Sequence, residues 1–123
     1  MDHVCLAFPV LAGKTDEARA FMRDLDGPRK AEFDVSERRI GITKELWYLA
    51  KAPTGDQLIG YMESNDFGRA VGLFSGSRDE FDVWFKQRLA AVTGVDLNNI
   101  PADFAPPELL SHYDVTQMQR AGS

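Results

Sequence analysis

The stretch "ELWYLAKAPTGDQLIGYMES", residues 45–64, contains two apolar runs on either side of a turn-forming segment. Large apolar side chains fill positions 46–49 and most of positions 58–62, and Pro53 and Gly55 between them favour a turn. The pattern predicts a β-hairpin. Because neighbouring residues of a strand point to opposite faces, apolar residues at consecutive positions indicate a sheet that is buried on both faces.

Strand and helix patterns precede the hairpin. The segment "HVCLAFPV", residues 3–10, is apolar at nearly every position and predicts a further strand. Residues 15–25 follow with one apolar face at helical spacing, and Thr15 is the expected N-cap. Pro28 is well placed to begin a second, highly charged helix over about residues 29–40, because its missing N–H is not needed there.

Two more helices are expected after the hairpin. Residues 65–77 carry an apolar stripe, with Asn65 or Asp66 as the cap. Ser77 and Glu80 have capping-box spacing, which predicts that the next helix begins at about residue 78. The apolar side chains of this last helix share one face, which makes packing against the sheet the expected role of Phe81, Trp84, Phe85, Leu89 and Val92.

Composition limits the function classes. The 123 residues suit one domain, and a net charge of -5 without clustered Lys or Arg argues against a nucleic-acid partner. Cys5 is the only cysteine, so the chain has no internal disulfide, and the protein is expected to be cytoplasmic. The Cys5 thiol is expected to be buried. No apolar run approaches the roughly 20 residues that span a bilayer, so no membrane association is expected.

The element order predicts an α+β fold with a ferredoxin-like antiparallel sheet and its helices on one face. Helices on one face leave the other uncovered, although the strands indicate two buried faces. A second copy of the chain, packed sheet to sheet by two-fold symmetry, would cover it. We therefore expect a homodimer.

The domain is expected over residues 1–115, and residues 116–123 are expected to be disordered. A proline-rich extension begins at about residue 95, and it is expected to include one short strand near its end.

Four segments carry a resemblance to a known family: "AGKTDEARAF", "TGDQLIGYMES", "FDVWFKQRLAAVTGVDL" and "PPELL". Over most of residues 3–110 the chain resembles a family of small uncharacterised bacterial proteins in the dimeric α/β-barrel superfamily, related to antibiotic-biosynthesis-monooxygenase-type barrels. Cofactor-free monooxygenases, muconolactone isomerases, haem-degrading monooxygenases and stress-response barrels belong to this superfamily. The resemblance therefore implies the fold and the dimer more than any one reaction. The usual fourth strand is not evident and would lie after Val92.

The candidate catalytic residues are polar groups of the sheet. Tyr61 and Glu63 share one face of their strand, so a phenol and a carboxylate would enter the same apolar cavity, where a carboxyl group becomes a general acid or base. The competing interpretation places Glu63 at the strand end in water. His3 is a third candidate, although a lone histidine at a strand start is more often structural. The two histidines stand at opposite ends of the chain, and no metal site is expected.

The candidate substrate-binding residues are aromatic, with one arginine. Trp47 and Tyr48 are neighbours in a strand, so only one of them faces any given cavity. Trp84 and Phe85 lie on the last helix, and Arg88 falls on the same face one turn later. Arg88 either stacks on Trp84 or pairs with an anion at the mouth of the barrel.

Together these patterns predict a dimeric barrel that binds a small apolar or aromatic molecule and needs no cofactor. Its chemistry would be that of a monooxygenase, an isomerase or a proton-transfer enzyme. The alternative is a non-catalytic dimer in which the aromatic side chains simply fill the core.

Overall fold

The computed structural model describes residues 1–101 and 103–115. Three strands and four helices follow one another in the predicted order. They are β1 (Asp2–Pro9), α1 (Thr15–Asp26), α2 (Lys30–Ile40), β2 (Ile42–Ala50), β3 (Gln57–Ser64), α3 (Phe67–Ser75) and α4 (Glu80–Thr93). No helix of the described residues is long and apolar enough to cross a membrane.

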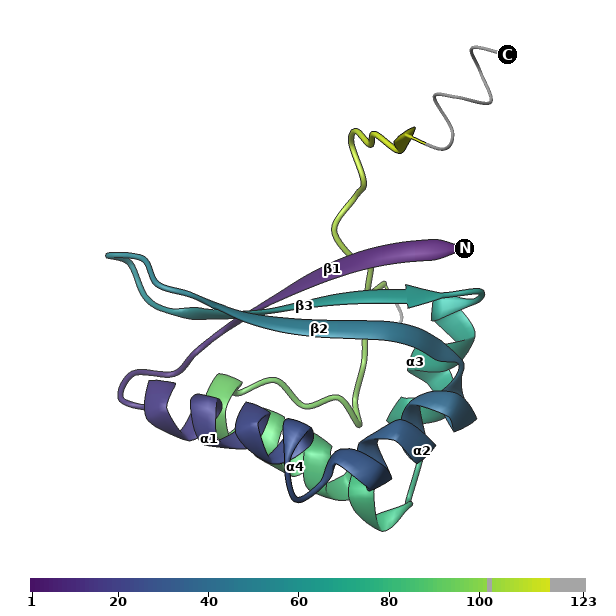
Figure 1. The fold of residues 1–123 in the computed structure, drawn as a ribbon. Coiled ribbons are helices and arrows are strands. Elements are labelled where there is room, and N and C mark those ends of the chain that lie inside the picture. The colour runs from purple at the N-terminus through teal and green to yellow at the C-terminus, as the bar shows by residue number, and fades with distance from the viewer. Residues whose placement is uncertain (102, 116–123) are drawn as a thin grey trace.

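The sheet is antiparallel, with β3 in the middle of the order β1-β3-β2. All four helices lie beneath the same face of it (Figure 1). This arrangement confirms the predicted fold class and the predicted hairpin. A register shift between Ile42 and Lys44 interrupts the pairing of β2 with β3 at the start of the hairpin.

The core lies between the sheet and the helices. Alternate side chains of the strands point into it, where they meet the aromatic residues of α1 and α4. Phe21, for example, contacts Trp84 and Phe85 edge to face, with ring centroids 5.5 and 5.0 Å apart. The buried members of this core are Phe8, Ala18, Phe21, Leu25, Phe33, Leu58, Phe81, Phe85, Leu89 and Val92.

The opposite face of the sheet is open in the protomer. Leu46 is 45% exposed and Tyr48 is 59% exposed on this face, and the Cys5 thiol is exposed rather than buried as expected. Only one of the two faces is therefore covered by the chain's own helices. The apolar residues of the open face remain available to a partner.

Helix capping differs from the sequence prediction at two of three sites. Thr15 does not cap α1; its hydroxyl instead donates to Asp56 Oδ2 at 2.7 Å. The Ser77 and Glu80 capping box does not form, because α4 begins two residues later with Asp79 as its cap. Asp66 caps α3 as predicted and accepts from the Arg69 N–H at 3.0 Å.

The segment after α4 contains no strand within residues 94–101 and 103–115. The described sheet thus has three strands, and the short strand expected near the end of the chain is absent from this part of it. The segment instead returns beneath the sheet before it leaves the body of the protein (Figure 1). The predicted disordered tail, residues 116–123, lies outside the described residues.

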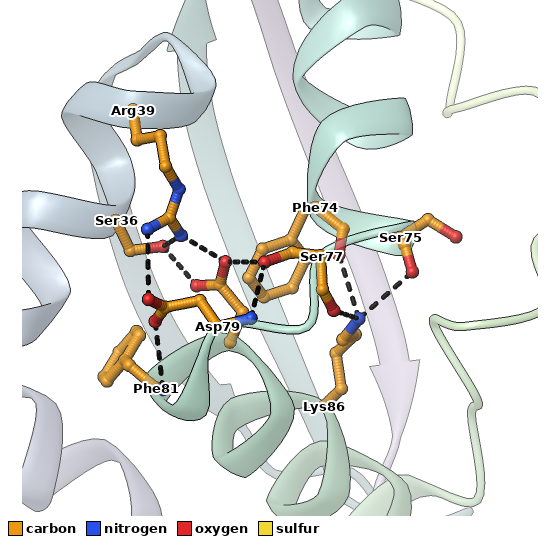
Figure 2. A network of polar contacts seen from close by, with 9 residues as sticks. Ser36, Arg39, Phe74, Ser75, Ser77, Asp79, Phe81 and Lys86 are labelled. Carbon is orange, nitrogen blue, oxygen red and sulfur yellow. Dashed lines mark hydrogen bonds and ion pairs between the residues drawn. The ribbon is translucent and has the colours of Figure 1, made fainter.

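A buried polar network joins α2 to α4 (Figure 2). Asp82 is fully buried on α4 and accepts from the hydroxyls of Ser36 and Ser77, each at 2.5 Å, and from the Arg39 guanidinium. Arg39 also lies 3.5 Å from Asp79. A buried carboxylate is tolerated when such donors surround it. This network fixes α2 against α4.

Lys86 ties the end of α3 to α4 in the same view (Figure 2). Its Nζ donates to the carbonyls of Phe74, Ser75 and Ser77 at 3.0, 3.1 and 3.0 Å. The last carbonyls of a helix have no partner within it, so the buried ammonium supplies one. Burial lowers the pKa of Lys86.

Candidate functional site

A cavity of about 340 Å³ lies between the sheet and the helices. Its walls come from all three strands, from α2, α3 and α4, and from the segment that follows α4. That volume is within the range of small-molecule sites, near its lower end. The walls are almost entirely apolar, and their aromatic members are Phe8, Trp47, Phe67, Phe74, Phe81, Phe85 and Phe104.

Two acidic residues, Glu37 and Asp96, line this cavity. Asp96 is exposed and accepts from the Asn98 N–H at 2.9 Å and the Asn99 side-chain amide at 2.6 Å. These hydrogen bonds lower the pKa of Asp96, which keeps it ionised. Among the described residues that line the cavity, none is Lys, Arg or His.

Glu37 lies in the last turn of α2, beside Ser36 of the buried network, and its carboxyl group meets that of Glu45 on β2. Oε2 of Glu37 is buried and accepts no hydrogen bond from an N–H or O–H group of the described residues. Burial, the neighbouring Glu45 carboxylate and the more distant Asp82 raise the pKa of Glu37 to about 10. Glu37 therefore keeps its proton at neutral pH.

Glu45 is the second member of the pair. Trp47 donates its indole N–H to Glu45 Oε2 at 2.8 Å, and Glu37 donates to the same carboxylate. Burial raises the pKa of Glu45, whereas these two hydrogen bonds act in the opposite direction. The proton consequently resides on Glu37, the member of the pair that lines the cavity.

Gly60 on β3 makes room for the indole of Trp47. The two residues are paired across β2 and β3, and a Cβ at position 60 would approach the Trp47 ring to 2.9 Å. Only glycine lets the ring lie flat over this point of the sheet. The glycine thus positions both a cavity wall and the donor to Glu45.

The structure brings the three predicted catalytic residues together, but on the open face of the sheet. Tyr61 donates to Glu63 Oε2 at 2.7 Å, and His3 Nδ1 lies 3.0 Å from the Tyr61 oxygen and 3.7 Å from Glu63 Oε2. The hydrogen bond to Glu63 raises the pKa of Tyr61. None of the three lines the cavity described above. Their catalytic role remains a prediction, since it depends on what covers this face.

The predicted substrate-binding residues divide between several places. Trp47 and Phe85 line the cavity, whereas Tyr48 points to the open face. Arg88 does not stack on Trp84. Its guanidinium lies 5.9 Å from the centre of the Phe21 ring, and Arg29 occupies the face of Trp84 at 4.5 Å. Arg88 Nε is buried without a hydrogen-bond partner among the described residues.

Sequence reasoning missed the Glu37 and Glu45 pair. The segment "ERRIGITKE", residues 37–45, has the charge of a solvated helix end, and most of it is exposed. One signal was present: Glu45 alternates with Trp47 and Leu49, so the three share a face of β2. A carboxylate on the same side of a strand as two large apolar residues indicates a buried acid.

No group of three or more His, Cys, Asp or Glu side chains that could hold a metal occurs in the described part of the chain.

No family model matches the chain, and no curated protein matches it in sequence. Among solved structures, it is similar to tetracenomycin F2 cyclase from Streptomyces glaucescens, a type-II polyketide cyclase. The TM-score is 0.53 at 12% sequence identity, over 93% of this chain and 98% of the cyclase. This chain therefore has the ferredoxin-like α+β fold predicted from its sequence, and the resemblance to dimeric α/β-barrel proteins is supported at the level of fold.

Proposed function

We propose that this protein binds a small, apolar or aromatic molecule in the cavity beneath the sheet and transfers a proton on it without a cofactor. The observation that carries the proposal is the carboxyl group of Glu37, whose Oε2 is buried without a partner among the described residues, in the wall of a largely apolar cavity of about 340 Å³. Burial and Glu45 raise the pKa of Glu37 to about 10, so it can act as an acid at neutral pH. The structural neighbour, a type-II polyketide cyclase, supports the same kind of ligand.

The apolar walls account for binding. Removing apolar surface from water stabilises a complex by about 25 cal/mol per Å², and aromatic walls favour flat ring systems. The non-catalytic alternative requires a core that is filled completely by its own aromatic side chains. Such a core would leave no space of this size. The cavity therefore favours the binding function.

The carboxyl pair accounts for proton transfer. Glu37 gives its proton to one atom of the ligand, and the Glu37 carboxylate that results removes a proton from another. The ligand is isomerised, no electrons are gained or lost overall, and the pair regains its starting state. An enolisable ketone is a suitable substrate, because the bond to its α-hydrogen breaks as the carbonyl oxygen is protonated.

The binding step is tested by filling the cavity. Ala70 is buried in α3 and lines the cavity, so Ala70→Leu adds three carbon atoms there, whereas Ala31→Leu adds them at an exposed site of α2. Titration with 2-tetralone, followed by the fluorescence of the two tryptophans, is expected to show saturable binding in the wild type and Ala31→Leu. Ala70→Leu is expected to weaken it at least tenfold. Equal affinity in all three proteins would place the ligand elsewhere.

The chemical step is tested by exchange of the α-hydrogens of 2-tetralone in D₂O, followed by NMR. The wild type is expected to accelerate the exchange, and Glu37→Gln, which retains the shape of the side chain but cannot release a proton, is expected to lose at least 100-fold of this rate. Glu108→Gln removes an exposed carboxylate and serves as the control. Exchange at the wild-type rate in Glu37→Gln would exclude Glu37 as the acid.

We also propose that the protein is a homodimer joined through the open face of the sheet. Leu46 and Tyr48 are large, exposed side chains on this face, and the hydrogen-bonded cluster of His3, Tyr61 and Glu63 lies on the same face. A second copy related by a two-fold axis would cover these residues with their own equivalents. The cluster would then lie inside the dimer.

The expected location is the cytoplasm. The one cysteine of the chain, Cys5, is exposed, which suits a reducing compartment, where thiols stay free.

A further inference from the structure

The last described residues form an arm whose large apolar side chains are exposed in the protomer. We call residues 108–115 the C-terminal arm, and every residue of it is exposed. Half of its residues are large and apolar. They are Leu109, Leu110, Tyr113 and Val115, which are 62, 84, 76 and 54% exposed. Segments that remain unfolded in water contain few such residues, and a group of them on a surface indicates an interaction site.

The arm leaves the protein on the open side of the sheet. The chain before it passes the start of β1, where Pro106 and Pro107 line one groove with His3. It then continues past the sheet on the side opposite to the helices (Figure 1). Proline fixes its own φ and keeps the preceding residue extended, so the chain is stiff at this point. Within the described part of the chain, no backbone hydrogen bond ties residues 105–111 to a strand or a helix. The arm therefore leads away from its own sheet.

We propose that the C-terminal arm packs against the sheet of a second copy of the chain, so that the two protomers exchange arms. The inference rests on the proposed homodimer and adds the segment that holds the two copies together.

A second copy matches both of the exposed apolar surfaces. Leu46 and Tyr48 are exposed on the open face, and the arm extends on the same side of the sheet. Under a two-fold axis the arm of each protomer meets the sheet of the other, so one arrangement buries both surfaces in both copies. The protomer's own sheet is the poorer partner, because the stiff chain at Pro106 and Pro107 would have to reverse its direction.

The arm is long enough for this exchange. Its residues, if extended, span roughly 26 Å, whereas sheets that pack face to face lie about 10 Å apart. The partner's sheet also offers a place to bind, because β1 and β2 are its edge strands. An edge strand presents unpaired N–H and C=O groups, with which an extended segment can pair. The arm is thus expected to reach an edge of the partner's sheet and the open face beside it.

The contribution of the arm is tested by sedimentation equilibrium. The double variant Leu110→Ser/Tyr113→Ser removes two large apolar side chains, and we expect it to raise the Kd of the dimer about 100-fold. Val35→Ser is the matched control, since Val35 is 60% exposed on α2, away from the sheet, and it should leave the Kd unchanged. Far-UV circular dichroism checks that all three proteins are folded. An unchanged Kd in the double variant, or an equal increase in Val35→Ser, would overturn the inference.

The place of the arm is tested by paramagnetic NMR in a Cys5→Ser background whose dimer is first confirmed by sedimentation. One ¹⁴N chain carries Ser111→Cys with a nitroxide label, and it is mixed with a ¹⁵N chain that has no label. Any broadening in the ¹⁵N spectrum then comes from the other copy. We expect the amide signals of the sheet strands to lose intensity and to recover when ascorbate reduces the label. A label at Val35→Cys should leave these signals unchanged, and so would the arm label if the inference were wrong.

The outcomes separate the arm from the dimer. If the wild type dimerises and the double variant dimerises equally well, the exchange of arms is overturned, while the proposed dimer stands. A wild type that sediments as a monomer would overturn both. Neither result bears on the binding of 2-tetralone, because neither Leu110 nor Tyr113 lines the cavity.

Discussion

The substitution Glu37→Gln is expected to stabilise the protein at neutral and alkaline pH. The pKa of Glu37 is about 10 in the folded protein against 4.5 as its ordinary value. Between these values the folded state holds a proton that the unfolded chain has released, so the free energy of unfolding falls as the pH rises, by about 1.4 kcal/mol per pH unit for one proton. The stabilising contribution is complete below pH 4.5 and is lost progressively toward pH 10.

Glutamine removes this dependence. Its amide donates to Glu45 without a titration, so the variant should be more stable than the wild type by about 2 to 4 kcal/mol at pH 7.5, and about equally stable at pH 4.5. A gain of that size in a site that would perform chemistry is expected, because functional groups are often retained at a cost in stability.

The assay is urea unfolding of both proteins at half-unit steps from pH 4.5 to pH 9, followed by far-UV circular dichroism. The difference between the two free energies of unfolding should grow steadily with pH. Glu108→Gln, which removes an exposed carboxylate, should follow the wild-type profile. Parallel profiles for the wild type and Glu37→Gln would refute the raised pKa of Glu37.

Three further predictions concern the surroundings of the site. Gly60→Ala should destabilise the fold by about 1 to 3 kcal/mol in thermal unfolding, because the new Cβ meets the Trp47 ring, whereas Gly72→Ala at an exposed, open helical position should stabilise it by about 0.5 to 1 kcal/mol. Lys86→Met should cost about 3 to 5 kcal/mol in urea unfolding, because three carbonyls lose their donor; a cost below 1 kcal/mol would show that water replaces it. Tyr48→Lys should convert the dimer to a monomer in sedimentation experiments without changing the secondary structure, and a wild type that sediments as a monomer would contradict the proposed interface.

Most of the fold was accessible from the sequence because it depends on local patterns. The consecutive apolar residues of the hairpin, the helical spacing of residues 81–92 and the turn residues near Gly55 each specify an element without reference to the rest of the chain. The capping of α4 was harder. Ser77 has the right spacing for a cap, but its hydroxyl donates to Asp82, five residues further along the chain, and Asp79 caps the helix.

The candidate site was less accessible because its members meet only in the folded chain. Glu37 belongs to a charged helix and Glu45 to a strand, and nothing in the local sequence shows that their carboxyl groups meet. The predicted cluster of His3, Tyr61 and Glu63 does form, since strand pairing aligns His3 with Glu63. Sequence alternation could place these residues on one face but could not tell which face the helices cover.

The arginine on the aromatic helix illustrates the same limit. Helical spacing places Arg88 one turn from Trp84, which suggests that the two stack. In the structure α1 and α2 approach from other directions, so Phe21 meets Arg88 and Arg29 covers Trp84. The partner of a long side chain is decided by packing between elements.

The most direct test of the account is the ¹³C NMR titration of the Glu37 side-chain carboxyl carbon, assigned by comparison with Glu37→Gln, in the free protein and with the ketone 2-tetralone. The account predicts a carboxyl group that is protonated at pH 7, with a titration midpoint near pH 10, and a resonance that shifts when the ketone binds. A midpoint near pH 4.5, or a resonance that the bound ketone leaves unchanged, would contradict it.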